Sequence, residues 1–359
     1  MESRNIVING QFTNRRMTGQ ERFAYELVSY LDELAQSSHI EFTLVVPKDA
    51  WNVPSLRNIP VVRYGKAKGS LWEQTYFTFY MMTHKGVSLN LCSIMPVFKP
   101  GIVCIHDIAY KLFPEFNTTT YSRISRVWHL CQYWAAKHFS PLILTVSDFS
   151  KRQMADIYKI EPDRIAVLGN GWDQFEKIES DESYGTEHPE LFEKPYFFSL
   201  GSLAPNKNIS WILEVARKHP QYNFLIGGNA SLKAYGTDYK EQDYQNVKFV
   251  GYISDGAVKY LMGHCKAFLF PSFFEGFGIP PLEALSTGAK IVVSNAACLP
   301  EIFGDSAYYI DPHDTNVDLD SLLAQPFGDG KEILERNRFN RFAKLLVNTL
   351  EDYFEKTNK

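Results

Sequence analysis

Two glutamates, Glu275 and Glu283, have seven residues between them and flank a loop that contains glycine. The segment Ala267–Gly288 (AFLFPSFFEGFGIPPLEALSTG) is typical of a buried strand, a loop and a helix. Gly276 and Gly278 let backbone N–H groups approach a ligand, and a helix start attracts anions. Either carboxylate can accept hydrogen bonds from sugar or ribose hydroxyls. The pattern indicates a nucleotide-sugar site, unless Glu283 is only a favourable charge at a helix start and Glu275 a loop carboxylate.

Lys207 and His106 are two further residues whose positions suggest chemistry. Lys207 comes shortly after the apolar run Tyr196–Leu200, and its ammonium can neutralise a phosphate. His106 follows the run Gly101–Ile105, which places it at the carboxyl end of a predicted strand. Parallel α/β sheets bind their ligands at that end. The alternatives are a solvated loop lysine and a structural histidine.

Short apolar runs that alternate with amphipathic stretches must position these residues, and this alternation is typical of a parallel-sheet α/β fold. A helix is expected from about Ile209 to Lys218. Strands are expected at Asn5–Asn9, Phe42–Val46, Gly101–Ile105, Leu142–Val146, Tyr196–Leu200, Tyr222–Ile226, Val247–Val250, Ala267–Phe270, Ile291–Val293 and Ala307–Ile310.

The run from Asp173 to Lys194 is polar and acidic, and it predicts a connection between two α/β domains. We therefore expect an N-terminal domain over residues 1–175 and a C-terminal domain over residues 190–334. The segment from Lys331 to about Phe354 has the pattern of one charged amphipathic helix.

The composition excludes several classes of protein. The 359 residues are 45 % hydrophobic and 22 % charged, which rules out a disordered chain, and no apolar run is long enough to span a membrane. The charged start of the chain predicts no signal peptide. Residues 1–175 carry 19 basic and 15 acidic side chains, whereas residues 176–359 carry 18 and 26. This balance argues against a nucleic-acid-binding protein and allows contact with an anionic membrane or a phosphorylated acceptor.

Cysteines and acidic pairs give little reason to expect a metal or a disulfide. The five cysteines are scattered without a C-x-x-C pair, which favours a reduced, cytoplasmic compartment. The acidic pair Asp318 and Asp320 is predicted to lie in a solvated loop rather than to hold a divalent ion. No metal and no cofactor are expected.

The chain resembles the retaining glycosyltransferases of family 4, which have the GT-B fold: two Rossmann-like domains facing each other across a cleft. The resemblance covers nearly the whole chain and its motifs stand in the family's order. Its signature is the run Glu275-Gly276-Phe277-Gly278-Ile279-Pro280-Pro281-Leu282-Glu283. The other motifs are Thr18-Gly19, Arg22-Phe23-Ala24, Leu71-Trp72-Glu73-Gln74, His106-Asp107-Ile108, Thr145-Val146-Ser147-Asp148-Phe149-Ser150, Gly169-Asn170-Gly171, Pro205-Asn206-Lys207-Asn208 and Gly251-Tyr252-Ile253-Ser254-Asp255.

The resemblance implies a role for each site residue. Glu283 holds the ribose of the donor, Glu275 lies near the sugar, and His106 reaches the sugar from the N-terminal domain. Lys207 neutralises the diphosphate, but Asn206 stands where the family usually has arginine, which weakens the cation clamp. Backbone contacts to the donor are implied for Gly19, Gly276, Phe277, Gly278 and Ile279, and contacts to the base for Tyr252 and Ile253. The C-terminal helix, residues 335–359, is expected to pack back on the N-terminal domain.

The resemblance implies a metal-independent hexosyltransferase that moves a hexose or deoxyhexose, with mannose or rhamnose favoured, to a saccharide or lipid-linked saccharide acceptor in the synthesis of capsule, O-antigen or exopolysaccharide. Peripheral contact with the inner membrane surface follows from such an acceptor. A nucleotide-sugar epimerase of the same fold and a non-catalytic sugar-nucleotide-binding protein are the alternatives. A dehydrogenase is disfavoured because no G-x-G-x-x-G follows the first strand. The sequence does not identify the donor sugar, the base or the linkage.

Overall fold

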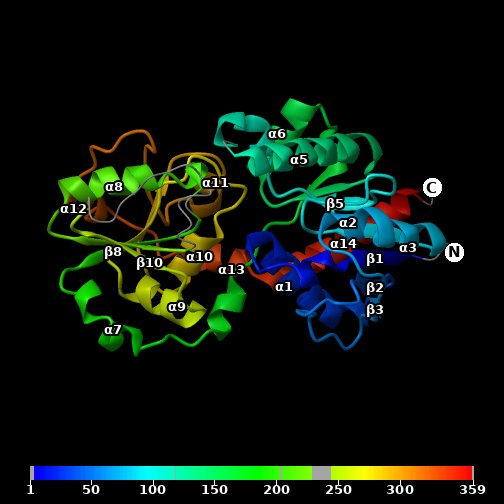
Figure 1. Ribbon diagram of the computed structural model, residues 1–359, viewed down its shortest axis with the longest axis horizontal. Coiled ribbons are helices and arrows are strands. Elements are labelled where there is room, and N and C mark those ends of the chain that lie inside the picture. Colours follow the sequence, from blue (N-terminus) through cyan, green and yellow to red (C-terminus); the bar gives the residue numbers. More distant parts are fainter. Residues whose placement is uncertain (1–3, 118, 203, 229–243, 358–359) are drawn as a thin grey trace. The chain divides into compact units, whose positions relative to one another are not determined.

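The computed structural model describes residues 4–117, 119–202, 204–228 and 244–357, which fold into two α/β units. Unit 1 comprises Met1–Leu112, Ile124–Gly171 and Asn337–Lys359, and unit 2 comprises Phe113–Arg123 and Trp172–Arg336 (Figure 1). Each unit has its own parallel sheet.

Unit 1 is built on a seven-stranded sheet in the order β3-β2-β1-β4-β5-β6-β7, in which every pairing is parallel. The order runs outward from β1 in one direction and from β4 in the other, so the sheet reverses its winding between these two strands. The strands are β1 Asn5–Asn9, β2 Glu41–Val46, β3 Val61–Arg63, β4 Val87–Asn90, β5 Ile102–Cys104, β6 Ile143–Thr145 and β7 Ile165–Val167.

Two apolar clusters join the sheet of unit 1 to its helices. In the first, Val103 and Ile143 pack against Tyr133 of α5 (Thr120–Phe139) and Met154 of α6 (Asp148–Tyr158). In the second, β1 and β2 pack against Trp72 and the segment that follows it. The elements are η1 Gly10–Asn14, α1 Gly19–Ala35, α2 Ser70–Trp72, the π-helical turn η2 Glu73–Phe77, α3 Thr78–Thr83, α4 Ala109–Leu112, α5 Thr120–Phe139, α6 Asp148–Tyr158, η4 Pro162–Arg164 and α14 Phe339–Thr357, with η3 Pro114–Phe116 in unit 2.

The last helix of the chain, α14, lies beside α1 and completes the core of unit 1 (Figure 1). The ring of Phe339 is fully buried and stacks on Tyr30 at a centroid distance of 6.1 Å. A Cβ on Gly171 would lie 2.3 Å from the Phe339 ring, so only glycine permits this approach. The C-terminal segment is thus part of the fold of unit 1.

Unit 2 has a six-stranded parallel sheet in the order β10-β9-β8-β11-β12-β13, which reverses its winding between β8 and β11. The strands are β8 Tyr196–Leu200, β9 Asn223–Gly227, β10 Val247–Gly251, β11 Ala267–Phe270, β12 Ile291–Ser294 and β13 Tyr308–Ile310. Helices α8 (Ile209–Lys218) and α12 (Leu319–Leu323) cover one face, where Trp211, Phe224 and Leu319 share a core. Helices α9 (Asp255–His264) and α10 (Ile279–Ser286) lie on the other face (Figure 1).

The other elements of unit 2 are short, and its longest helices, α8 and α9, have ten residues each. They are η5 Asp173–Lys177, α7 Tyr184–Glu187, η6 Pro189–Leu191, η7 Pro205–Lys207, α8 Ile209–Lys218, α9 Asp255–His264, α10 Ile279–Ser286, α11 Leu299–Phe303, α12 Leu319–Leu323 and α13 Lys331–Arg336.

The sequence predicted that the acidic run from Asp173 to Lys194 connects two domains, and this prediction is wrong. The run belongs to unit 2, where Phe175 and Leu191 are buried. Lys259 of α9 donates hydrogen bonds to the main-chain oxygens of Phe175 and Ile178 at 3.0 and 2.7 Å. A few apolar anchors and one lysine therefore hold a segment that is polar on average.

Two other boundaries also differ from the sequence prediction. The single helix expected over residues 331–354 is two helices, α13 in unit 2 and α14 in unit 1, because the chain passes from one unit to the other at Asn337. Phe113–Arg123 group with unit 2 rather than with the expected domain 1–175, and the Phe113 ring lies 5.1 Å from that of Phe274.

No helix among the described residues is both long enough and apolar enough to cross a membrane.

Candidate functional site

The carboxyl ends of β8 and β11 form the point at which the sheet of unit 2 reverses its winding. Strands on the two sides send their crossover helices to opposite faces, which leaves a crevice between the two loops that follow, and open α/β sheets bind ligands there. The loop after β8 carries Asn206 and Lys207, and the loop after β11 carries Glu275. The sheet order therefore brings together residues 68 positions apart.

Lys207 and Glu275 form an ion pair across this reversal point. Lys207 Nζ lies 2.6 Å from Glu275 Oε1, and the side chains are 22 % and 13 % exposed. The ammonium also lies 5.2 Å from the centroid of the Phe270 ring. The pair is thus partly withdrawn from water and remains accessible, so Lys207 is held in place by a charge that a bound anion must compete with.

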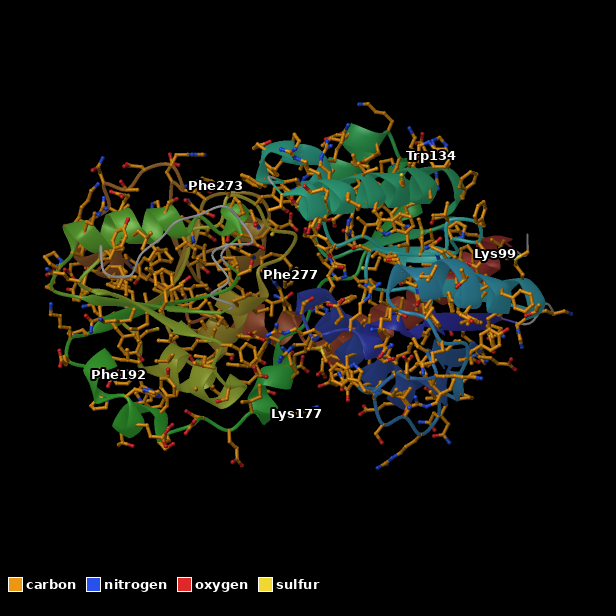
Figure 2. The ribbon with its side chains drawn as sticks, viewed as in Figure 1. Lys99, Trp134, Lys177, Phe192, Phe273 and Phe277 are labelled. Atoms are coloured by element: carbon orange, nitrogen blue, oxygen red, sulfur yellow. The ribbon has the colours of Figure 1, made fainter. Side chains whose placement is uncertain are left out.

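The two loops that carry this pair are joined by their backbones. The N–H of Phe273 donates to the main-chain oxygen of Asn206 at 2.8 Å, and the side-chain amide of Asn206 donates to that of Phe274 at 3.4 Å. Asn206 therefore links the two loops. Figure 2 labels Phe273 and Phe277, which lie on the same loop.

The start of α10 presents the backbone amides predicted to hold phosphate. Gly278 precedes the helix with φ at +105°, and a Cβ there would lie 2.8 Å from Cδ2 of Leu299, so the position needs glycine. Cys298 donates from Sγ to the main-chain oxygen of Phe277 at 3.2 Å. With Phe277 fixed in this way, the amides of Phe277, Gly278 and Ile279 lie at a helix N-terminus, which favours anions.

Glu283 lies in the first turns of α10 and is buried. Gln174 of η5 is also buried, and its Nε2 donates to Glu283 Oε1 at 2.9 Å. Sequence reasoning missed Gln174, which it placed in a connecting segment. The only signal in the sequence is its place just after Gly169-Asn170-Gly171, and this gives no hint of a partner 109 positions away.

Tyr252 and Ile253 follow the carboxyl end of β10, an edge strand of the sheet of unit 2. Lys207 and Glu275 also follow the carboxyl ends of their strands, but β9 and β8 lie between β10 and β11. The N–H of Gly228 donates to the main-chain oxygen of Gly251 at 2.8 Å, which fixes where β10 ends, and the Tyr252 side chain is exposed.

His106 and Gly19 lie in unit 1. His106 is buried, and its Nε2 donates to the main-chain oxygen of Leu91 at 2.9 Å, which leaves Nδ1 as the unprotonated nitrogen of the neutral ring. Burial lowers the pKa of His106, although the bond to Leu91 opposes this shift. Gly19 is the first residue of α1, and a Cβ there would meet no atom within 4 Å among the described residues.

Unit 1 also contains a charged cluster where its own sheet reverses its winding, between β1 and β4. Arg15 NH2 lies 3.0 Å from Glu73 Oε2, and Asn9 donates to Glu73 Oε1 at 3.2 Å and to Asn90 Oδ1 at 2.9 Å. Burial raises the pKa of Glu73, and Arg15 opposes the shift. Sequence reasoning gave Glu73 no role, although the Trp72-Glu73-Gln74 motif contained the signal.

Asp318 and Asp320 are exposed, as the sequence predicted, but they lie at the start of α12 rather than in a loop. Asp318 precedes α12, and its Oδ1 accepts from the N–H groups of Asp320 and Ser321, both at 3.1 Å. Asp320 accepts from the Tyr222 hydroxyl instead. One aspartate is a helix cap, and the other is an exposed partner of Tyr222 and Lys266. Among the described residues, no group of three or more His, Cys, Asp or Glu is placed to hold a metal ion.

Residues 184–344 match the family model described as glycosyl transferases group 1. The chain is 28 % identical to the O-antigen chain mannosyltransferase B of Escherichia coli over 230 residues, which are 60 % of this chain and 58 % of that protein. The chain thus spans less than two thirds of the length of this relative.

Two solved structures share the fold over nearly the whole chain. Sucrose-phosphate synthase of Thermosynechococcus elongatus superposes with a TM-score of 0.69 at 13 % identity, covering 98 % of this chain and 99 % of that one. HepE of Anabaena, in complex with UDP and glucose, gives 0.64 at 16 % identity, covering 97 % and 99 %. The fold class predicted from the sequence is confirmed: the chain has two Rossmann-like domains of the GT-B type, and its residues 184–344 match the glycosyl transferases group 1 family model.

Proposed function

We propose that the protein is a retaining hexosyltransferase that moves mannose or rhamnose from a nucleotide-sugar to a saccharide or lipid-linked saccharide in the synthesis of a cell-surface polysaccharide. The mannosyltransferase relative and the group 1 domain support a transferase over an epimerase or a silent binding protein. The observation that carries the proposal is the Lys207–Glu275 pair at the winding reversal of unit 2, in which Glu275 lies on the loop that leads into α10.

The residues of unit 2 suit the successive parts of a nucleotide-sugar. Glu283 accepts from ribose hydroxyls, the amides of Phe277, Gly278 and Ile279 donate to phosphate, and Lys207 supplies positive charge beside them. When Lys207 pairs with the diphosphate instead of with Glu275, the Glu275 carboxylate accepts hydrogen bonds from the sugar hydroxyls. Each group meets the part of the ligand that its chemistry favours.

In the proposed reaction, negative charge grows on the diphosphate as the bond from the anomeric carbon to the phosphate oxygen breaks. Lys207 and the amides at the start of α10 stabilise that charge. The acceptor hydroxyl attacks from the face the diphosphate leaves, and its proton passes to the departing phosphate oxygen. Configuration at the anomeric carbon is then retained, which NMR of the product linkage tests: a product of inverted configuration would contradict this route.

The proposal gives Lys207 and backbone amides the role that a divalent ion has in other glycosyltransferases. We therefore expect transfer to continue in excess chelator. Activity that disappears with chelator and returns with magnesium or manganese would show that the leaving group needs a cation besides Lys207.

The experiment that tests the function is a two-step screen. Nucleotide-sugars are first tested for thermal stabilisation of the protein, and the ones that bind are then assayed for nucleotide release with and without saccharide acceptors. A transferase releases nucleotide only with acceptor. Conversion of the donor without acceptor would identify an epimerase, and stabilisation without release under any acceptor would identify a binding protein.

We further propose that the protein works in the cytoplasm and meets an anionic membrane through α5. Within Ile124–Phe139, the exposed side chains of Ile124, Val127, Cys131 and Trp134 follow one helical stripe (Trp134 is labelled in Figure 2), and His138 and Phe139 are exposed at the end of the helix. Ile124 is 66 % and Trp134 is 52 % exposed. The same segment contains Arg126 and Lys137 and no acidic residue. A helix with exposed apolar side chains, half-buried basic ones and no acidic residue suits an anionic lipid surface.

Vesicle sedimentation tests this surface. We expect binding to vesicles of phosphatidylcholine with phosphatidylglycerol, weaker binding to phosphatidylcholine alone, and loss of binding for the double variant Ile124→Gln, Trp134→Gln. The matched control is Phe79→Gln with Met82→Gln, which removes two exposed apolar side chains from α3. Equal loss in both double variants would assign the binding to general surface hydrophobicity.

A further inference from the structure

Glu283 has a side-chain neighbour from a segment that precedes the sheet of unit 2. Gln174 Nε2 donates to Glu283 Oε1 at 2.9 Å, and the side chains lie within a buried part of the unit, at 6 % and 7 % exposure. A carboxylate that accepts a hydrogen bond in a buried site has little rotational freedom. Gln174 therefore fixes how the Glu283 carboxylate is turned.

The segment that carries Gln174 is itself held firmly. Just before it, the indole N–H of Trp172 donates to the main-chain oxygen of Leu334 at 2.8 Å. Just after it, Lys259 donates to the main-chain oxygen of Phe175 at 3.0 Å and lies 5.5 Å from the Phe175 ring centroid. Both sides of Gln174 are thus tied to other elements of unit 2, so its side chain is placed by the fold.

The other half of the Gln174 amide has no partner among the described residues. Its Oε1 is buried and accepts no hydrogen bond there. A buried carbonyl oxygen without a donor is costly, and such atoms are uncommon in folded proteins. An O–H group from a ligand would satisfy this oxygen.

We propose that Gln174 is a positioning residue for Glu283 and that its Oε1 accepts a hydrogen bond from one hydroxyl of the donor ribose while Glu283 accepts from the other. The inference rests on the proposed function, because it takes the ligand to be a nucleotide-sugar. Two neighbouring acceptors suit the two O–H donors of a vicinal diol. A deoxyribose offers one donor and leaves one acceptor unpaired.

Calorimetry with GDP and UDP and with their 2′-deoxy and 3′-deoxy forms tests this role. For the wild-type protein, we expect each deoxy form to bind about tenfold more weakly than the ribonucleotide with the same base. In Gln174→Met, which keeps the chain length and removes both polar atoms, one of the two deoxy forms should bind as well as the ribonucleotide. Gln174→Glu keeps an oxygen but removes the N–H that Glu283 accepts, so its ribonucleotide affinity should also fall about tenfold.

The matched control is Asn223→Leu. Asn223 is a buried amide of the same unit that donates to the main-chain oxygen of Leu191 at 3.1 Å, at the amino end of β9 and so at the opposite edge of the sheet. This variant should lose stability and keep the full preference for ribose.

Three outcomes separate the two proposals. If Gln174→Met and Gln174→Glu keep the wild-type preference over both deoxy forms, the role of Gln174 is refuted while the transferase proposal stands. If Asn223→Leu loses the preference as well, a general loosening of unit 2 explains the result and the specific contact is refuted. If the wild-type protein binds no nucleoside diphosphate, the proposed function fails first.

Discussion

The ion pair between Lys207 and Glu275 gives the sharpest prediction, because the two partners should affect nucleotide binding in opposite directions. Their atoms lie 2.6 Å apart while the side chains stay partly exposed. In the absence of ligand, the Glu275 carboxylate neutralises the Lys207 ammonium, which is the positive charge proposed to bind the diphosphate. Glu275→Gln removes this competition, and Lys207→Met removes the cation.

The expected magnitudes follow from the kind of contact. A hydrogen bond from Lys207 to phosphate is worth about 1.5–3 kcal/mol, so Lys207→Met should weaken nucleoside diphosphate binding about tenfold to 150-fold. A partly exposed ion pair is worth about 1 kcal/mol, so Glu275→Gln should strengthen diphosphate binding about fivefold. The same variant should reduce turnover, because the sugar loses its carboxylate.

Calorimetry with a nucleoside and with its diphosphate measures both effects, and nucleotide release with the intact donor measures turnover. The nucleoside serves as the internal control, since neither variant should change its affinity. If Glu275→Gln weakens the diphosphate, or if nucleoside and diphosphate affinities fall in the same proportion in both variants, the assignment of Lys207 to phosphate is refuted.

Three further predictions concern stability. The buried His106 takes up a proton less readily than it does in the unfolded chain, so the free energy of unfolding should fall as the pH drops below about 6.5. Urea titrations at several pH values should show that this free energy depends less on pH in His106→Gln than in the wild-type protein. An unchanged dependence on pH would mean that His106 is not protected from protonation. Phe339→Ala should destabilise unit 1 by about 3–5 kcal/mol, because the ring is fully buried between α14 and α1, and a loss below about 1 kcal/mol would contradict that packing. Gly278→Ala should lower the free energy of unfolding in urea by about 1–2 kcal/mol, because Gly278 has a positive φ and Leu299 lies close to it. The control is Gly263→Ala in α9, where an added Cβ meets nothing nearer than 4.0 Å and should not destabilise the protein. Similar losses of unfolding free energy in both variants would point to helix packing rather than to φ.

Continuous apolar runs in the middle of each sheet could be predicted from the sequence. Asn5–Asn9, Tyr196–Leu200 and Ala267–Phe270 are strands with the predicted bounds, because buried parallel strands need apolar side chains on both faces. Val87–Asn90 was missed because Ser88 and Asn90 interrupt its apolar pattern. Both residues are nevertheless buried. Asn90 donates hydrogen bonds to the main-chain oxygens of Pro100 and Ile102, and these replace the hydrogen bonds that its amide would make with water.

The candidate site was predictable where it depends on strand ends and not where it depends on distant partners. The sequence placed Lys207 and Glu275 after separate strands, and the sheet order brings them together. It gave no sign that Glu275 would neutralise Lys207, so from the sequence alone Glu275→Gln is expected to leave nucleotide binding unchanged. The contact of Gln174 with Glu283 was equally hidden, because no periodicity relates a short turn to a helix 109 positions later.

The hydrogen bond from Gln174 to Glu283 also determines where this protein can be divided to make chimeras. The family model begins at residue 184, whereas the donor to Glu283 and the indole of Trp172 lie upstream of it. A chimera joined at residue 184 would combine this Glu283 with another protein's residue at the position of Gln174. The cut that preserves the inherited pairing is before Trp172, where unit 2 begins again after its short first segment. A chimera made to exchange donor specificity between relatives would therefore need to include residues 172–183, the twelve residues that precede the segment matched by the family model.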